Sequence, residues 1–306
     1  MKVTEIDYRR LDMSHRILRA VGETESAIGG PFGDSVGLPD IYYVDSGSGS
    51  DNNDGRDPAF PLATIDAANN KCTAGQGDVI LVQPGHSETL TAEITLDVIG
   101  VSVIGVGQGT LRPQITQAFA GDAIAIDAAN VSVENIYFNE ATTAPGAGGA
   151  AIDINAAFAI VKGCHFDLGT DDLEAITITA TGDDCVIEDN VFIVTADGPN
   201  AGIEIEAIVE RVTIRGNYFD GATDDWDVGG VNSGVAQIEC VVLDNVCSGG
   251  PGIIFSAAAT GVIGRNFFAN GTLGSMLDPG SCMCFENYEA DAIDQSGRLF
   301  PTTVAS

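Results

Sequence analysis

Acidic side chains recur at alternating positions of several short apolar segments. In AIAID, AIDIN and GIEIE, the carboxylates of Asp127, Asp153 and Glu204 alternate with isoleucines. Alternate side chains of a β-strand point to opposite faces, so the isoleucines would face a core and the carboxylates would face outward. Two carboxylates placed on either side of a glycosidic bond can act as the acid and the base of its hydrolysis. These three residues are therefore the candidate catalytic groups if the protein is an enzyme.

The separation of these carboxylates depends on how the segments stack. If consecutive segments form neighbouring parallel strands, Asp153 and Glu204 lie two strands apart, or about 9.6 Å. That distance is near the upper end of the roughly 6.5–9.5 Å that suits an inverting hydrolase. The alternative is a solvated acidic face on which water and salt screen the like charges.

Paired aspartates also occur in TGDDCV, residues 181–186. This sequence resembles the paired-aspartate motif of polygalacturonase-type glycoside hydrolases. The Asn-Thr-Asp, Gly-His-Gly and Arg-Ile-Lys sequences that accompany the motif in that family do not occur here, so we interpret TGDDCV as an acidic turn. His86 and His165 have no serine or cysteine partner visible in the sequence, and we interpret both as lone surface histidines.

Two further segments have unusual composition. In DNNDGRD, the residues Asp51, Asp54 and Asp57 are weak candidates for a calcium site, although the spacing does not match an EF-hand loop. The loop GATDDWDVGGVNSG contains Trp226, the single tryptophan of the chain. If exposed, this ring would favour stacking on a sugar or contact with another subunit. The alternative is a ring that folds back over its own strand. We expect no cofactor other than this weak calcium site.

The chain of 306 residues is strongly acidic, with a net charge of -31. Residues 1–19 contain five basic and three acidic side chains, a net of +2, so the remainder carries -33. Such a body should repel nucleic acid and anionic membranes. We find no apolar run long enough to span a bilayer and no secretory signal at the start of the sequence. The first residues and the body are therefore electrostatically different.

A recurring phrase indicates which elements would position these side chains. VTIRGNYF, residues 212–219, has close copies in VIEDNVFI, VVLDNVCS and VIGRNFFA. Alignment of the copies places one asparagine per repeat in a common position, at intervals of 27, 28, 21 and 21 residues: Asn190, Asn217, Asn245, Asn266 and Asn287. Asparagine tolerates left-handed backbone geometry and can hydrogen-bond its own kind, so we expect these residues to sit at a bend and form a ladder.

Each repeat therefore consists of three short strands, with the asparagine between the second and the third. An aliphatic residue precedes the asparagine by three positions, and a phenylalanine usually follows it by two. A repeat of this size cannot bury its apolar face alone, but copies stacked at about 4.8 Å per layer can do so. The sequence predicts an all-β fold, a single-stranded right-handed parallel β-helix.

The start of the repeat region resembles the N-terminal edge of pectate-lyase-like β-helix proteins. The resemblance lies in PLATIDAA and GDVILVQPG, which match the patterns PxxTIxxA and GDxIxxxPG of that family. It implies a short helix over residues 62–72 that covers the open first coil. It does not specify an activity, because this fold is used by lyases, hydrolases, esterases and virion proteins.

This resemblance implies three regions and several functions. We expect an attachment arm over residues 1–40, the β-helix over 41–290 and a tail over 291–306. By likeness to β-helix proteins of tailed phages, the chain would be a virion surface protein, a homotrimer that decorates or cements a capsid. Its arm would bind a capsid or tail protein through Arg9, Arg10, Arg16, Ile17 and Leu18. The alternatives are a tail spike or other glycan hydrolase or lyase, and a non-catalytic adhesin that binds a host or environmental glycan.

Overall fold

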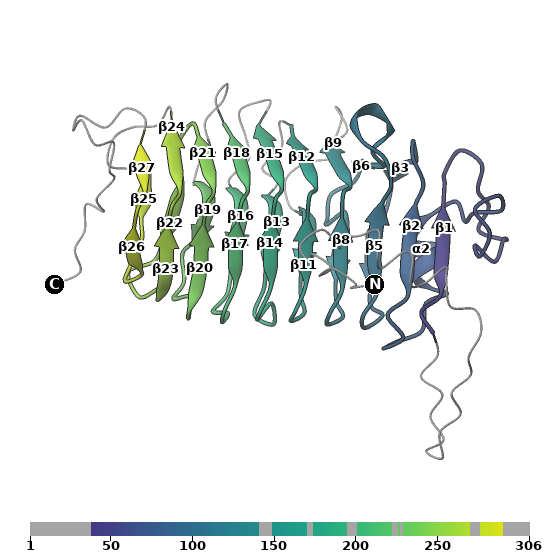
Figure 1. Ribbon diagram of the computed structural model, residues 1–306, viewed down its shortest axis with the longest axis horizontal. Helices are drawn as coiled ribbons and strands as arrows, with labels where there is room; N and C mark the ends of the chain where they lie inside the picture. The colour runs from purple at the N-terminus through teal and green to yellow at the C-terminus, as the bar shows by residue number, and fades with distance from the viewer. Residues whose placement is uncertain are drawn as a thin grey trace, which may run out of the picture.

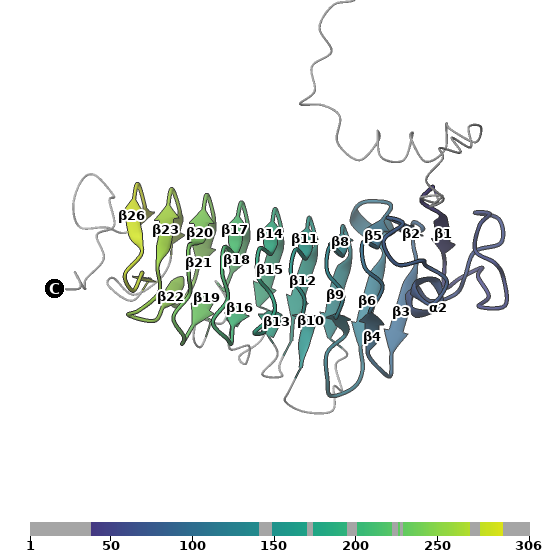
Figure 2. The same cartoon turned by 90° about the horizontal axis from the view of Figure 1, so that it is seen from below.

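Three parallel β-sheets run along the long axis of the molecule in the computed structural model (Figure 1). The structure describes residues 38–140, 149–169, 174–194, 201–221, 226, 229–269 and 276–289. Within each coil the chain passes from a strand of the eight-stranded sheet to one of the ten-stranded sheet and then to one of the nine-stranded sheet. Figure 2 shows the same coils from a second side. The predicted right-handed parallel β-helix is confirmed.

Strands are short, as the alternating sequence pattern predicts. The ten-stranded sheet contains β1 (Ile41–Val44), β2 (Val79–Val82), β5 (Ser102–Gly105), β8 (Ser132–Glu134), β11 (Ile160–Lys162), β14 (Val186–Glu188), β17 (Thr213–Arg215), β20 (Cys240–Leu243), β23 (Gly261–Gly264) and β26 (Met283–Phe285). The eight-stranded sheet contains β4 (Ile94–Leu96), β7 (Ile124–Ile126), β10 (Ala150–Ile154), β13 (Glu174–Ile178), β16 (Ala201–Ile205), β19 (Gly229–Ser233), β22 (Ile253–Phe255) and β25 (Leu277–Asp278). The nine-stranded sheet contains β3 (Ser87–Leu90), β6 (Gln114–Gln117), β9 (Tyr137–Glu140), β12 (His165–Leu168), β15 (Val191–Val194), β18 (Tyr218–Asp220), β21 (Val246–Ser248), β24 (Phe267–Ala269) and β27 (Tyr288–Glu289).

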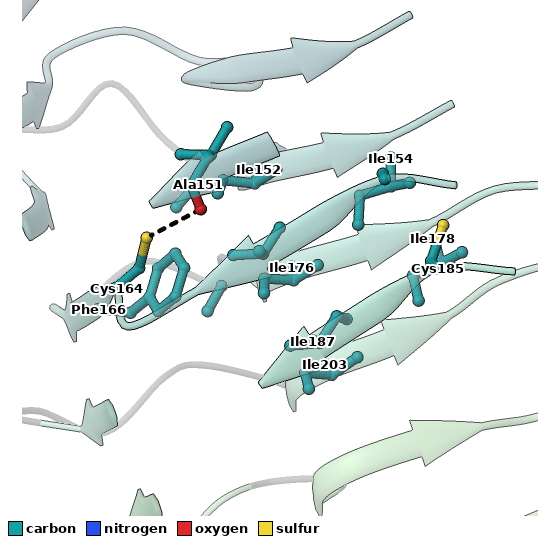
Figure 3. Close-up of a cluster of buried hydrophobic side chains, with 14 of the residues drawn as sticks. Ala151, Ile152, Ile154, Cys164, Phe166, Ile176, Ile178, Cys185, Ile187 and Ile203 are labelled. Carbon is teal, nitrogen blue, oxygen red and sulfur yellow. Dashed lines mark hydrogen bonds between the residues drawn. The ribbon is translucent and has the colours of Figure 1, made fainter. Parts of the chain in front are cut away.

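The core consists of like residues stacked on like residues. Ile152, Ile176 and Ile203 are in register on neighbouring strands of the eight-stranded sheet and are fully buried (Figure 3). On the nine-stranded sheet, the rings of Phe166 and Phe192 stack with centroids 4.9 Å apart and planes 6° from parallel. Strand spacing sets this distance, since residues in register lie one strand apart. These rows were expected from the repeat, and they hold each outward side chain at a fixed layer.

The predicted asparagine ladder is present, but its backbone geometry differs from expectation. Asn217 Nδ2 donates to Asn245 Oδ1 at 3.0 Å and to the carbonyl of Ile187 at 3.0 Å. The left-handed residue is the one before each asparagine, including Asp189 with φ 57° and Gly216 with φ 64°. The expected left-handed asparagines are therefore a mistaken prediction. The asparagine must turn its amide into the core to reach its neighbours, and the preceding residue makes the bend.

The first coil is covered by the α-helix α2 (Ile65–Asn69), which is shorter than the predicted span of 62–72. Thr64 caps this helix by accepting a hydrogen bond from the amide of Ala67. Ile65 and Leu62 are fully buried under the cap. A short 3-10 helix, η2 (Gly109–Leu111), interrupts the connection before β6.

The arm over residues 1–37 and the tail from residue 290 lie outside the described residues, as do Arg9, Arg10, Arg16, Ile17 and Leu18. Within the described part of the chain, we find no helix that is long and apolar enough to span a membrane.

Candidate functional site

Acidic residues line the outer face of the eight-stranded sheet. Asp153, Thr177 and Glu204 are in register on β10, β13 and β16, so the two carboxylates lie two layers apart as expected. Asp127 directly follows Ile126, which pairs with Ile154, so its layer neighbour is Asn155 rather than Asp153. The structure therefore places Asp153 and Glu204 in one outward row and Asp127 in the next row.

Hydrogen bonds between layers fix the carboxylate of Asp153. Its Oδ1 accepts from Thr177 Oγ1 at 2.5 Å, and its Oδ2 accepts from Asn155 Nδ2 at 2.7 Å. The same Asn155 amide donates to Asp127 at 3.1 Å. Thr179 donates to Asn155 Oδ1 at 2.6 Å, which orients the amide so that its nitrogen faces both carboxylates. Asp127 and Asp153 are thus linked through one amide.

Glu204 is half-buried and its surroundings favour the protonated form. Burial raises the pKa of Glu204, the hydrogen bond from Asn232 opposes this, and the nearby carboxylates of Glu174 and Glu206 raise it further. The Asn232 amide donates to Glu204 Oε2 at 2.7 Å. A carboxylic acid with a raised pKa is suited to donate a proton.

A groove of about 290 Å³ lies on this face, and its lining includes Asp153 but not Glu204. Its polar lining includes Asp122, Asp153, Glu174, Thr177 and Glu206. Burial raises the pKa of Asp122, and its carboxylate accepts a hydrogen bond from the backbone of Ala150 at 2.6 Å. A groove of this charge would repel an anionic polysaccharide and would accept a neutral one.

Basic side chains lie on another side of the helix, as the sequence predicted. Lys162 and Arg215 lie on the ten-stranded sheet, and both form ion pairs with Glu188 between them. Burial raises the pKa of Glu188, but hydrogen bonds from these two cations outweigh it and lower the pKa below its usual value. This arrangement does not supply the basic residue that a pectate-lyase mechanism would need in the acidic groove.

The acidic turn TGDDCV joins neighbouring layers. Asp183 accepts a hydrogen bond from the amide of Glu210 at 2.7 Å, and Asp184 forms an ion pair with Arg211 at 2.7 Å. Both carboxylates therefore bind the equivalent turn of the next coil. Their partners support our interpretation of this segment as an acidic turn.

Trp226 is buried, so of the two alternatives left open by the sequence the folded-back ring is the one observed. Its side chain is only 1% exposed and packs edge-to-face on Phe219, with ring centroids 6.2 Å apart. A side chain at Gly221 would collide with the indole, so this glycine makes room for the ring. The indole folds back over its own strand, which was the alternative interpretation. A ring enclosed in this way has no face available to a sugar or to another subunit.

The aspartates of the weak calcium candidate act as acceptors in turns. Asp51 accepts from the amides of Ala63 and Thr64 beside the start of α2. Asp54 accepts from the amide of Arg56, and Asp57 accepts from the amide of Ala59. Among the residues that the structure describes, no group of three or more His, Cys, Asp and Glu side chains is arranged to hold a metal ion.

His86 is buried, in contrast to the surface position expected from the sequence. It is 1% exposed; its Nδ1 accepts from the amide of Ser46 at 3.0 Å and its Nε2 lies 3.2 Å from Glu88 Oε2. Ser46 is 40 residues away in the sequence, so spacing gave no signal for its contact with His86, whereas Glu88 is two residues away. His165 is half-buried beside Tyr137, and burial lowers its pKa.

Comparisons with known proteins show the fold. No protein-family model matches the chain, and no curated protein matches it in sequence. A pectin methylesterase from carrot is similar in structure, with a TM-score of 0.52 and 14% identity over 90% of this chain and 88% of that one. A rhamnogalacturonan lyase matches with a TM-score of 0.48 and 13% identity over 76% and 74%. The protein "Geobacillus virus E2 - ORF18" matches with a TM-score of 0.35 and 12% identity over 73% and 56%.

Proposed function

We propose that this chain is a structural protein of a tailed-phage virion, a capsid decoration or cementing protein. The observation that carries the proposal is the use of outward polar groups as links between layers. Asp153 binds Thr177, Glu204 binds Asn232 and Asp184 binds Arg211, each on the next coil. Such links stiffen a rod, which is what a surface scaffold requires. The virion assignment itself rests on the resemblance of the sequence to phage β-helix proteins.

In this proposal the arm over residues 1–40 attaches the protein to a capsid or tail protein. Arg9, Arg10 and Arg16 supply positive charge and Ile17 and Leu18 supply apolar contacts, within the first 19 residues, whose net charge of +2 is opposite in sign to that of the body. The β-helix projects outward on the virion surface as part of a homo-oligomer, a trimer by the same resemblance. The acidic body keeps neighbouring particles apart through like-charge repulsion.

Attachment is tested with a variant that lacks residues 1–38. The full-length chain is expected to co-sediment with virus particles from its source, and the truncated chain is expected to stay in the supernatant. A full-length variant with Arg9, Arg10 and Arg16 replaced by glutamine shows whether attachment depends on the positive charge of the arm or on the presence of the segment. Incorporation of the truncated chain into particles at the full-length level would disprove anchoring by the arm.

A second candidate function is hydrolysis of a neutral glycan on the acidic outer face of the eight-stranded sheet. It is favoured by the raised pKa of Glu204, which suits a proton donor, and by the position of Asp153 in the same outward row two layers away. Under this hypothesis, Asp153→Asn and Glu204→Gln each abolish the release of reducing sugar, whereas Asp183→Asn in the acidic turn retains it. If the unmodified protein releases no sugar from a broad panel of neutral polysaccharides, the hydrolase hypothesis is wrong.

A further inference from the structure

Charge is unevenly distributed around the β-helix. Between residues 114 and 289, the described basic side chains are Lys162, Arg211, Arg215 and Arg265, and all lie on the ten-stranded sheet or in its bordering turns. Each forms an ion pair with a carboxylate. Over the same span, the described strands of the eight-stranded sheet carry outward acids and no basic residue. Along the eight-stranded sheet, no described basic side chain of this span offsets the outward acids.

One of the two outward rows of the nine-stranded sheet is apolar, whereas the other includes Asp167 and Asp220. Val191, Tyr218, Val246, Phe267 and Tyr288 are in register on five successive strands. Tyr218, Phe267 and Tyr288 are 40%, 42% and 41% exposed. The row extends over four strand spacings, or about 19 Å. These side chains point away from the core phenylalanines, so packing of the β-helix itself does not account for them.

A second apolar row lies across the asparagine bend, on the ten-stranded sheet. Val186, Thr213, Val241, Val262 and Met283 are in register there, and Met283 is 69% exposed. Between the rows lie the ion pairs of Glu188 with Arg215 and of Asp244 with Arg265, together with the exposed acids Asp189 and Glu286. We call these two rows and the bend between them the neutral face, after the uncharged side chains of the rows. An extended exposed apolar surface of this kind marks an interaction site.

We propose that the neutral face is the surface through which copies of this chain associate, with their long axes side by side. Copies that carry a charge of -31 repel one another, and the repulsion is least when their acidic faces point apart. Contact through the neutral face directs the eight-stranded sheets outward and buries the exposed aromatic residues. A basic partner would instead bind the acidic face. Because Val191 and Val246 interrupt the aromatic residues, the row offers no continuous series of rings for a sugar chain.

This inference deepens the proposed homo-oligomer by assigning its interface, and it can be tested without virus particles. The mass of the purified full-length chain is measured by sedimentation over a range of concentrations. Phe267→Glu is expected to weaken association at least about 100-fold, because it buries an unpaired charge. Ile254→Glu is the matched control, since Ile254 points outward from the acidic face in register with Asn232. This control lowers the affinity much less.

Salt gives an independent measurement on the unmodified protein. Association is expected to strengthen as salt is added, because the Debye length falls from about 10 Å at 0.1 M to about 3 Å at 1 M, which screens the repulsion between the acidic copies.

Circular dichroism establishes that each variant is folded, and Tyr218→Glu replaces Phe267→Glu if the latter does not fold. A monomeric wild-type chain, or equal weakening by Phe267→Glu and Ile254→Glu, would overturn the assignment. Loss of particle attachment with self-association intact would refute only the virion role.

Discussion

Replacing Asn217 by alanine tests whether the asparagine ladder stabilises the fold. This side chain is 1% exposed and forms four hydrogen bonds. Its Nδ2 donates to the carbonyl of Ile187 and to Asn245 Oδ1, each at 3.0 Å. Its Oδ1 accepts from the backbone amide and the side-chain amide of Asn190, each at 3.0 Å. At about 1 kcal/mol for each bond, the loss in the free energy of unfolding is about 4 kcal/mol.

That loss corresponds to a fall in the melting temperature of about 8 °C or more for a domain of this size. Thermal and urea unfolding are followed by far-ultraviolet circular dichroism. Asn232→Ala is the control, because Asn232 lies in the outward row and its side chain makes one described hydrogen bond, to Glu204. Asn287→Ala, at the last rung with three such bonds, should fall between the two. If Asn217→Ala and Asn232→Ala unfold at the same temperature, the ladder contributes nothing measurable and the reasoning is refuted.

Three further outcomes are expected. Because the pKa of Glu188 is lowered in the folded protein, this residue contributes stability at neutral pH that is lost as the pH falls below the ordinary glutamate value of 4.5. In the Glu188→Gln variant, the free energy of unfolding should therefore fall less steeply between neutral and acid pH. An unchanged pH profile would contradict this. Cys240 and Cys282 have sulfurs 3.8 Å apart but lie two layers apart, roughly 9.6 Å. A mild oxidant should therefore leave both thiols free in a titration of the folded protein. Trp226 should show blue-shifted fluorescence that acrylamide quenches poorly, and strong quenching would place the indole at the surface.

The repeat made most of the fold predictable. Aliphatic, asparagine and phenylalanine positions recur at fixed offsets, and stacking requires like positions to meet in neighbouring layers. Ile214, Asn217 and Phe219 lie in the rows that this alignment predicted. The left-handed position was misassigned, because Asp189, Gly216 and Arg265 share the φ sign but not the residue type. A conformation that glycine, aspartate and arginine can all adopt leaves no single residue type to recognise.

The candidate site was predictable only in part. The outward direction of Asp153 and Glu204 follows from the alternation along each strand, and their shared row follows from the register of the repeats. The raised pKa of Glu204 depends on burial and on Glu174 and Glu206, which the structure brings together. His86 was expected at the surface because its neighbours in the sequence are polar, and the sequence left the position of Trp226 open; both side chains are buried.

The sequence by itself determined the layered architecture of this protein, because each repeat can bury its apolar residues only against a copy of itself. It also determined which side chains point outward, through the period of two along each strand. Only the tertiary structure decided which outward rows lie on the same side of the rod. The bends of each coil bring outward rows from different sheets side by side, although the strands of these sheets follow one another along the chain. The separation of an acidic face from a neutral one is therefore a property of the coil and not of any single segment.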